Sequence, residues 1–314
     1  MKKSIKWLLA ALILFLAIFT STLIYEAATG DFRLSNITHD FPQDPEWNMP
    51  PPTDEQKAWL TEVMDQPYRW LGQGHQIYAF ASSDQRYVLK IFKFKRLKPS
   101  WTTKYLSYIP FVNTYFSHQE NKRLRRLDKL FRGYKLAYIV DRAQTGILFL
   151  HLNNQSTDLN QQVTVIDKLG ISHTLELDSL VFAIQEHALK TKDVLKALLK
   201  EANVTAVEQH INNLFDMYMS EYKLGIMDQD HNILQNTGFV GERPIRLDIG
   251  QLKYDEAIRD PAMQKQDLIK ITSKRINRWL LSDYPDMQPQ IAADMEHKLS
   301  ELFGEPIRLP SEKR

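Results

Sequence analysis

The feature that most constrains this 314-residue chain is an apolar stretch near its N-terminus. Trp7–Tyr25 is a run of 19 residues without a charge, and three lysines precede it. A helix of that length spans roughly 28 Å at 1.5 Å per residue, which is close to the hydrocarbon thickness of a bilayer. The sequence therefore predicts a basic flank over residues 1–6 and one membrane-spanning helix over residues 7–25.

A cleaved signal peptide is the alternative interpretation, with a cut near Ala27 or Ala28. Glu26 stands where a small residue is favoured for a cut after Ala28, which favours a retained anchor. Both interpretations give the same orientation, because the positive-inside rule keeps the three lysines on the cytoplasmic side. We expect a single-pass membrane protein whose main domain, residues 30–314, is extracytoplasmic, with a cleaved secreted form as the alternative.

The composition excludes several classes of function. With 43% hydrophobic and 25% charged residues, the chain is neither wholly disordered nor a multi-span membrane protein. The absence of cysteine excludes disulfides, thiolate-bound metals and a thiol nucleophile. A formal net charge of +2 argues against a dedicated nucleic-acid-binding protein, so we expect no nucleic-acid partner.

The chain beyond the apolar stretch divides into a spacer and two lobes. Residues 26–52 contain five prolines and few apolar residues, which predicts a semi-extended spacer. Thr53 to Gln56 has the pattern of a capping box, so a helix should begin there and run to about Met64. Strand-type alternation between Tyr68 and Phe94, around a turn over residues 82–85, follows this helix.

The predicted lobes differ in their secondary structure. Residues 53–168 form a β-rich lobe, in which a helix over residues 117–136 precedes strands over 146–152 and 162–166. Residues 169–314 form a mainly helical lobe with a strand over 244–247. Its predicted helices cover residues 180–189, 193–202, 205–222, 262–281 and 289–303. This order of elements predicts an α+β protein of two lobes behind an N-terminal transmembrane helix.

Lys90 occupies an unusual position in a predicted strand. Side chains alternate along a strand, so Lys90 shares one face with Val88 and Phe92 and is the polar group of that face. Such a lysine either extends to solvent or has a buried anionic partner. Lys93 and Lys95 lie beyond this face, and we expect them to be solvated.

Gly72 and Gly74 lie between two predicted strands, eighteen and sixteen residues before Lys90. Two glycines one residue apart let a loop approach a ligand closely, as the covering of phosphates requires. Most such pairs are simply turns.

Glu120 lies on a predicted helix in line with Leu124, Leu127 and Phe131. Their spacing places this carboxylate on the face that packs on the sheet, where it can meet an inward lysine. The alternative is that Glu120 only favours the positive end of its helix.

The densest group of oxygen-bearing side chains lies between residues 224 and 252. Its members are Asp228, Asp230, Asn232, Asn236 and Asp248. Carboxylate and amide oxygens are suited to a site for magnesium and phosphate. No other histidine is near His231 in the sequence, so we interpret it as a hydrogen-bonding residue of this loop and not as a metal ligand.

The order of these parts resembles the protein-kinase-like fold over about residues 68–252. Gly225–Asp228 with Asn232–Leu234 is most similar to the catalytic loop of phosphatidylinositol kinases and other atypical kinases. Ile245–Gly250 resembles the metal-binding Asp-Phe-Gly strand, with Ile249 in place of phenylalanine. The resemblance implies a small β-rich lobe with one main helix, a larger helical lobe, and ATP and Mg²⁺ as cofactors.

The resemblance also implies roles for single residues. Lys90 would hold the α- and β-phosphates and pair with Glu120. Gly72 and Gly74 would cover the phosphates.

In the acidic loop, Asp228 is favoured over Asp230 as the base that orients the acceptor hydroxyl. Asp248 would bind magnesium, with Asn236 favoured over Asn232 as the second metal ligand. The family places this asparagine five residues after the catalytic aspartate, whereas Asn232 follows Asp228 by four and Asn236 follows Asp230 by six.

The main functional hypothesis is a membrane-tethered phosphotransferase that moves a nucleotide γ-phosphoryl group to a protein, lipid or small-molecule hydroxyl. A catalytically inactive kinase-like scaffold is the alternative, because a domain outside the cytoplasm meets little ATP. The His-Arg pair and a third loop glycine of the family are also missing. An unrelated anchored α+β domain that binds calcium is a third. The basic cluster Lys122–Lys135 is either a docking site for anionic lipid or an acidic protein, or a solvated helix face.

Overall fold

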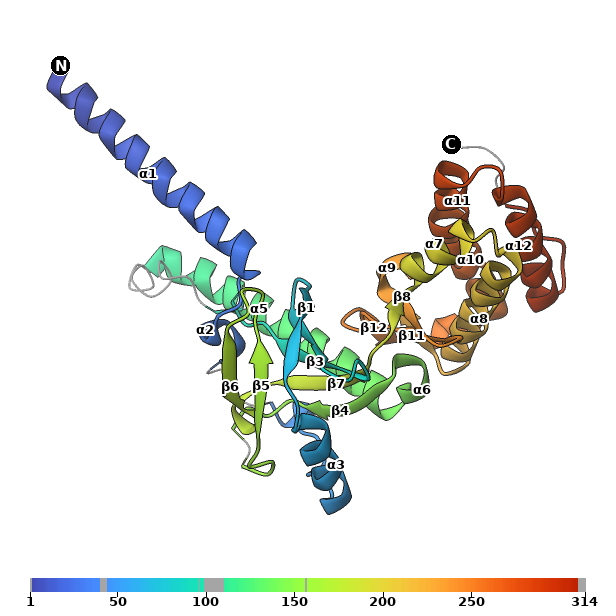
Figure 1. Cartoon of the computed structure of the whole chain (residues 1–314), viewed down its shortest axis with the longest axis horizontal. Helices are drawn as coiled ribbons and strands as arrows, with labels where there is room; N and C mark the ends of the chain where they lie inside the picture. Colours follow the sequence, from blue (N-terminus) through green and yellow to red (C-terminus); the bar gives the residue numbers. More distant parts are fainter. Residues whose placement is uncertain (1, 40–43, 96, 99–109, 156, 310–314) are drawn as a thin grey trace. The chain divides into compact units, whose positions relative to one another are not determined.

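The computed structural model describes residues 2–39, 44–95, 97–98, 110–155 and 157–309, and it describes only the backbone of residues 2–5, 8, 110–117 and 120. Internal contacts divide the chain into two compact units. The first unit contains Met1–Thr102 and His151–Ala183, and the second contains Thr103–Leu150 and Ile184–Arg314. The architecture is mixed α+β, with a seven-stranded sheet and one apolar N-terminal helix (Figure 1).

The strands of the large sheet have the order β4-β7-β3-β2-β1-β5-β6. They are β1 (Tyr68–Gln73), β2 (Ile77–Ser82), β3 (Tyr87–Phe92), β4 (Ile147–His151), β5 (Gln162–Ile166), β6 (Ser172–Glu176) and β7 (Phe182–Glu186). The β1 and β5 strands are parallel, whereas β2 is antiparallel to both β1 and β3. The helical elements of the first unit are α1 (Lys2–Thr29), α2 (Leu34–Ile37), η1 (Pro45–Trp47), α3 (Asp54–Met64) and η2 (Leu177–Ser179).

The second unit is mainly helical, and it contains two small sheets with the strand orders β11-β10-β8 and β12-β9. Its helices are α5 (Pro110–Ile139), α6 (Arg142–Thr145), α7 (Thr191–Lys200), α8 (Val204–Lys223), α9 (Ile233–Asn236), η3 (Glu256–Arg259), α10 (Pro261–Ile271), the π-helix η4 (Thr272–Asn277), α11 (Arg278–Asp283) and α12 (Gln288–Phe303). Besides β4 up to Leu150 and β7 from Ile184, which belong to the large sheet, its strands are β8 (Leu189–Lys190), β9 (Ile226–Asp228), β10 (Thr237–Val240), β11 (Arg243–Arg246) and β12 (Leu252–Tyr254).

Local sequence signals account for several of these elements. The capping box that begins α3 is present, because Gln56 N–H donates to Thr53 Oγ1 at 3.2 Å and Thr53 N–H donates to Gln56 Oε1 at 3.0 Å. The apolar face predicted for residues 205–222 forms the buried face of α8. Gly225 follows this helix with a φ of +75°, a conformation that glycine adopts without strain.

The helix predicted over residues 180–189 is wrong, since this segment contains the strands β7 and β8. Leu180 to Ile184 form a continuous buried apolar run. Such a run fits a strand that is buried on both faces as well as it fits a helix, so its period does not distinguish the two. Strands β6, β9, β10 and β12 were not expected from the sequence, since each is short or carries polar residues.

The first part of the predicted spacer packs against the sheet. Phe32 is 5% exposed. Its ring makes edge contacts with the rings of Trp70, Tyr78 and Phe80, at centroid distances of 6.4, 5.2 and 5.3 Å. Ile37 and Trp47 are also buried. Residues 29–39 therefore belong to the folded part of the first unit, because Phe32 and Ile37 are buried and Phe32 packs against side chains of the sheet.

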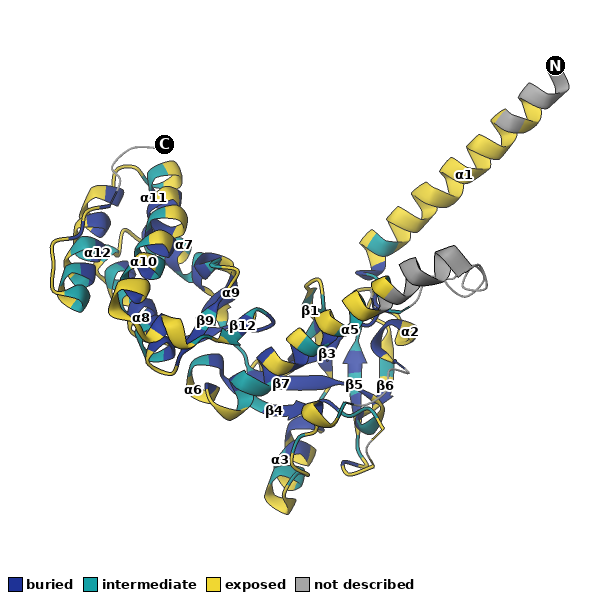
Figure 2. Ribbon diagram, turned by 180° about the vertical axis from the view of Figure 1, so that it is seen from behind, coloured by how far each residue is buried: buried dark blue, intermediate teal, exposed yellow. Residues whose placement is uncertain are grey.

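Over Leu9–Thr29, helix α1 is long and apolar enough to cross a membrane. The apolar segment on which this rests has no buried residue. Figure 2 shows its described surface as exposed along nearly its whole length. A membrane anchor and a signal sequence have these properties in common.

Helix α5 belongs to the second unit, although the sequence placed it in the β-rich lobe. Its C-terminal half packs on β12 and α6. Gly133 permits this packing, because a Cβ at this position would lie 3.0 Å from Ile249 O and 3.3 Å from Leu252 O. The two-lobed kinase-like arrangement remains a prediction.

Candidate functional site

Two strand pairs build the loop that contains most of the candidate residues. Asp228 ends β9 and pairs with Leu252 of β12, and Thr237 begins β10 and pairs with Arg246 of β11. The chain between β9 and β10 therefore lies beside the chain between β11 and β12. Backbone N–H groups of Leu247 and Asp248 both donate to the carbonyl of Asn236, at 2.7 and 3.2 Å.

Asp230 and Asn236 are in direct contact within this loop. Asn236 Nδ2 donates to Asp230 Oδ2 at 2.7 Å, and Asp230 N–H donates to Asp228 Oδ1 at 3.0 Å. Asp230 is exposed, whereas Asp228 is 2% exposed. Asp248 is exposed on the neighbouring segment, where its Oδ1 accepts the Gly250 N–H at 3.2 Å. Three candidate oxygen-bearing side chains thus belong to adjoining segments of the second unit: Asp230 and Asp248, which are exposed, and Asn236, which is 8% exposed.

Asn232 has a different environment from Asn236. It stands at the N-cap position of α9, and its side chain makes no capping hydrogen bond. Its carbonyl accepts the N–H of Gln235 at 3.0 Å and of Asn236 at 2.8 Å. Of the two asparagines, Asn236 is the one whose side chain bonds to a candidate carboxylate.

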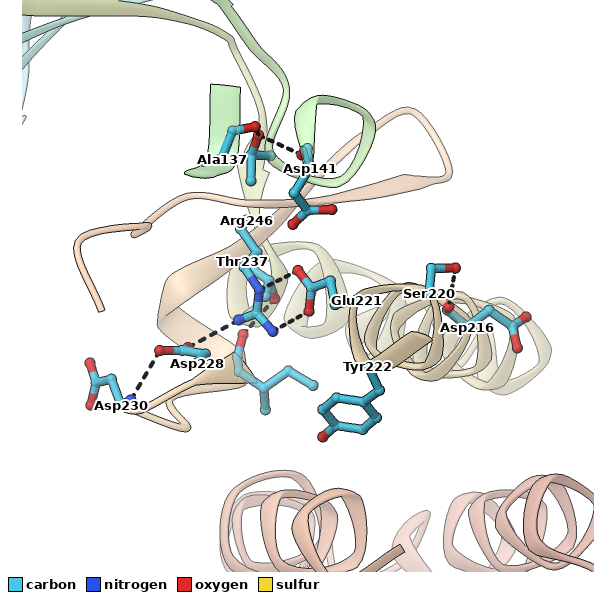
Figure 3. Close-up of polar contacts among 12 residues, drawn as sticks. Ala137, Asp141, Asp216, Ser220, Glu221, Tyr222, Asp228, Asp230, Thr237 and Arg246 are labelled. Carbon is cyan, nitrogen blue, oxygen red and sulfur yellow. Dashed lines mark hydrogen bonds and ion pairs between the residues drawn. The ribbon is translucent and has the colours of Figure 1, made fainter. Parts of the chain in front are cut away.

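A buried ionic network is connected to the start of the loop through Asp228 (Figure 3). Arg246 donates to both carboxylate oxygens of Glu221 at 2.5 Å each and to Asp228 Oδ2 at 3.0 Å. The Arg246 guanidinium also stacks 4.4 Å from the centre of the Tyr218 ring. Because Asp228 in turn accepts the Asp230 N–H, the network fixes the start of the loop to α8 and β11.

Burial dominates the protonation of this network. It raises the pKa of Glu221, although the charge of Arg246 opposes the shift. Burial and the nearby Glu221 carboxyl raise the pKa of Asp141 to about 8. The Arg246 pKa lies well above its usual value, because Glu221 and Asp228 favour the charged guanidinium although burial opposes it.

His231 connects the loop to α10. Its Nε2 is 2.7 Å from Asp267 Oδ1, and Tyr222 Oη donates to Asp267 Oδ2 at 2.8 Å. His231 adopts a φ of +56°, which turns the chain between Asp230 and α9. The residue acts as a hydrogen-bonding residue of the loop, as we expected from the sequence.

Sequence reasoning missed four residues that hold this region together: Glu221, Arg246, Lys129 and Gly133. Lys129 Nζ donates to the side-chain oxygens of Gln229 at 2.7 Å and Gln251 at 2.8 Å, one on each adjoining segment. Only Glu221 could have been noticed in the sequence, because a carboxylate on the otherwise apolar face of α8 indicates a buried charge that needs a partner. Neither Lys129 nor Gly133 has a distinguishing sequence context.

The remaining candidates lie in the first unit. Lys90 is 8% exposed at the centre of β3, opposite Ala79 of β2. Gly72 follows a bulge in β1, and a Cβ at Gly72 or Gly74 would contact nothing within 4 Å. Lys93 is not simply solvated, since its Nζ donates to the carbonyl of Gly74 at 3.0 Å and to the side chain of Gln73.

The structure brings the candidates of the acidic loop together within the second unit, and it describes Lys90, Gly72 and Gly74 within the first. The Glu120 side chain lies outside the described residues, so its pairing with Lys90 stays a prediction, as does the convergence of Lys90 with Asp248. Among the described residues, no group of three or more His, Asp or Glu side chains has a geometry that could hold a metal ion. The loop instead offers Asp230 and Asp248 with the amide of Asn236.

Comparisons with known proteins give a distant structural likeness. No family model matches the chain, and no curated protein matches it. Among solved structures, the high-resolution crystal structure of WbdD is similar, with a TM-score of 0.38 and 10% sequence identity. The similarity covers 76% of this chain and 46% of the WbdD chain, so this chain matches less than half of that protein.

Proposed function

We propose that the chain is a membrane-tethered, kinase-like phosphotransferase that transfers the γ-phosphoryl group of ATP to a hydroxyl group of a protein, lipid or small molecule. The observation that supports this proposal most directly is the contact of Asp230 with Asn236 beside Asp248. Phosphoryl transfer depends on positioned oxygen ligands and charge stabilisation more than on covalent chemistry by the protein.

The two aspartates of the loop differ in exposure and in hydrogen-bond partners. Asp228 is buried and bonded to Arg246, so its carboxylate is committed to the scaffold. Asp230 is exposed and next to Asn236, which gives it access to an acceptor hydroxyl. We therefore assign to Asp230 the orientation of the acceptor and to Asp228 the positioning of Asp230 through its backbone N–H.

Asp248 and Asn236 are the residues that would hold magnesium in this proposal. Their carboxylate and amide oxygens are of the type that Mg²⁺ accepts, with water and substrate phosphates as its other ligands. Bound magnesium would neutralise the phosphate oxygens. Lys90 would contact the α- and β-phosphates and pair with Glu120, while the turn at Gly72 and Gly74 would cover the phosphates.

The test uses the full chain in detergent micelles. Thermal unfolding is measured without ligand, with ATP, with Mg²⁺ and with both, for the wild type and for Asp248→Asn. Glu242→Gln, an exposed change at the β10–β11 turn, is the matched control. We expect stabilisation by ATP with Mg²⁺ in the wild type and the control and a clear loss of it in Asp248→Asn.

Transfer of labelled γ-phosphate then separates an enzyme from an inactive scaffold. Stabilisation that is equal in all three proteins, or missing in all three, contradicts a nucleotide site at Asp248. Stabilisation of the wild type without any transfer to water, lipid or protein acceptors supports the inactive kinase-like scaffold instead.

A further inference from the structure

The C-terminal end of α1 is fixed to the first unit by a set of direct contacts. Lys95 pairs with Glu26 at 2.7 Å and with Asp31 at 2.9 Å. Lys168 Nζ donates to the carbonyl of Ala27 at 2.7 Å, and Tyr78 Oη donates to the carbonyl of Asp31 at 2.5 Å. The helix therefore continues into the folded body and is not joined to it by a free linker.

These contacts come from one end of the sheet. Strands β1, β3 and β5 run in the same direction, because β1 and β5 are parallel and β2 is antiparallel to both β1 and β3. Lys95 lies shortly after the end of β3, and Lys168 lies in the turn after β5. The carboxyl ends of these strands thus adjoin the last turn of α1.

Aromatic residues mark the two ends of the apolar part of α1. Trp7 and Tyr25 are 18 residues apart, which corresponds to about 27 Å along a helix. This separation matches a bilayer core, and Trp and Tyr are enriched at its two interfaces. The Arg33 guanidinium lies 4.7 Å from the centre of the Tyr25 ring. If α1 spans a membrane, one interface therefore passes through Tyr25, two residues before the Ala27 carbonyl that Lys168 binds.

Exposed apolar side chains are present on the segments attached to this end of α1. Leu169 and Ile171, in the β5–β6 turn, are 54% and 53% exposed, and Leu34, next to Arg33, is 52% exposed. Scattered exposed leucines need no explanation on a soluble surface. Here they stand beside cations, which is the pattern of a surface that enters a lipid interface.

The carboxylates near this surface have partners within the protein. Glu26 and Asp31 pair with Lys95, and Asp167 Oδ2 is 2.9 Å from His173 Nε2. The hydrogen bond of Lys168 to a carbonyl leaves its positive charge uncompensated by that contact. Arg33 stacks on a neutral ring.

We propose that the end of the sheet at which β1, β3 and β5 finish rests in the headgroup layer of the same phospholipid membrane that α1 spans. Leu34, Leu169 and Ile171 enter the outermost acyl region. Arg33 and Lys168 lie beside lipid phosphates. The bilayer is the occupant that the contacts favour, because the exposed side chains belong to segments that bind the last turn of a candidate membrane helix.

The absence of cysteine from the chain makes this proposal testable by single labels. The variants Leu34→Cys, Leu169→Cys and Ile171→Cys each change an exposed side chain, so they should fold like the wild type. Each full-length protein is labelled with an environment-sensitive fluorophore and reconstituted into vesicles of phosphatidylcholine and phosphatidylglycerol in equal parts. Quenching is measured with lipids that carry a spin label either high or low on the acyl chain.

Two further labels serve as references. Ile13→Cys lies in the middle of α1, and Arg86→Cys lies exposed at the start of β3, at the opposite end of the sheet. We expect Ile13→Cys to be quenched by the deep spin label and Leu34, Leu169 and Ile171 labels by the shallow one. The Arg86→Cys label should lose no emission with either lipid.

Two results would overturn the proposal. In the first, the Leu169 and Ile171 labels show as little quenching as the Arg86 label while Ile13 is quenched. This result means that α1 spans the bilayer but the sheet stands clear of it. In the second, the Ile13 label is not quenched or is missing from the mature chain, so no membrane helix is present to bring the sheet to the lipid.

Discussion

Arg246 on β11 donates to both carboxylate oxygens of Glu221 on α8, and both side chains are completely buried. This pair joins a strand to the helix that precedes the acidic loop. The third contact of Arg246, to Asp228, extends the connection to the loop itself. The backbone N–H of Asp230 bonds to Asp228, so the position of Asp230 depends on a network of buried charged side chains.

Replacing Arg246 with methionine should strongly destabilise the second unit. Removing one partner of a buried ion pair leaves uncompensated charge and typically costs about 3–5 kcal/mol. Arg243→Met, three residues earlier on the same strand, removes a partly exposed pair with Glu186 and should cost less than about 1 kcal/mol. Urea unfolding of the full chain in micelles, followed by circular dichroism, measures both changes.

A double variant separates charge from packing in this test. Arg246→Met combined with Glu221→Gln removes the main unpaired carboxylate, so it should be more stable than Arg246→Met alone. Equal stability of Arg246→Met and Arg243→Met would contradict the structural role of the network.

Asp141 should make stability depend on pH in a particular direction. Its pKa is raised from 3.8 to about 8, chiefly by burial and by the Glu221 carboxyl. Between these values the unfolded chain has released the proton and the folded chain retains it, so stability falls as the pH rises through this window. Asp141→Asn has no such proton and should lose less stability between about pH 5 and pH 8. Urea midpoints measured across this range test the difference, and parallel pH profiles for the two proteins would count against it.

Local elements of this fold were predictable, because their signals lie within a few residues. The α3 capping box depends on Thr53 and Gln56, and the end of α8 depends on Gly225. The contact between Asp230 and Asn236 is also local, because the two residues are six positions apart, whereas the role of their loop stays a prediction.

Features that join distant residues were not predictable in the same way. Glu221 and Arg246 are 25 residues apart, and neither has a local pattern that names its partner. Phe32 is buried by rings that lie far from it in the sequence, those of Trp70, Tyr78, Phe80 and His173. The composition of the predicted spacer does not indicate that its first part packs against the sheet. The different burial of Asp228 and Asp230 likewise depends on the fold, and sequence spacing does not give it.

If Asp230 orients the acceptor, as we propose, Asp230→Asn should remove activity without a loss of stability, whereas Asp228→Asn should lower stability. Asp230→Asn keeps the shape of an exposed side chain, so we expect an unchanged unfolding midpoint, retained nucleotide stabilisation and loss of phosphate transfer. Asp228→Asn weakens a buried charged hydrogen bond to Arg246, so it should lower stability by about 1–3 kcal/mol. Thermal unfolding and labelled phosphate transfer on the same samples make the comparison. A stable Asp228→Asn protein without transfer activity, beside an active Asp230→Asn protein, would reverse the assignment.

Gly72→Ala and Gly74→Ala test whether the β1–β2 turn serves a ligand. Neither glycine has a positive φ, and a Cβ at either position would meet nothing within 4 Å. The fold itself therefore tolerates alanine, and we expect unfolding midpoints within about 0.5 kcal/mol of the wild type. If the turn covers phosphates, nucleotide-dependent stabilisation should fall in both variants. Unchanged stabilisation would show that the pair is only a turn.

Gly30→Ala should uncouple α1 from the sheet, and Gly170→Ala provides a matched control. Both glycines have positive φ, +64° and +84°, so alanine costs about 1–2 kcal/mol at either position. A Cβ at Gly30 would also collide with the Trp70 ring, whereas a Cβ at Gly170 would meet open space. Overpacking of this kind adds about 1–3 kcal/mol. Thermal unfolding of the full chain should therefore show a larger loss for Gly30→Ala, and equal losses would mean that Trp70 does not pack on the end of α1.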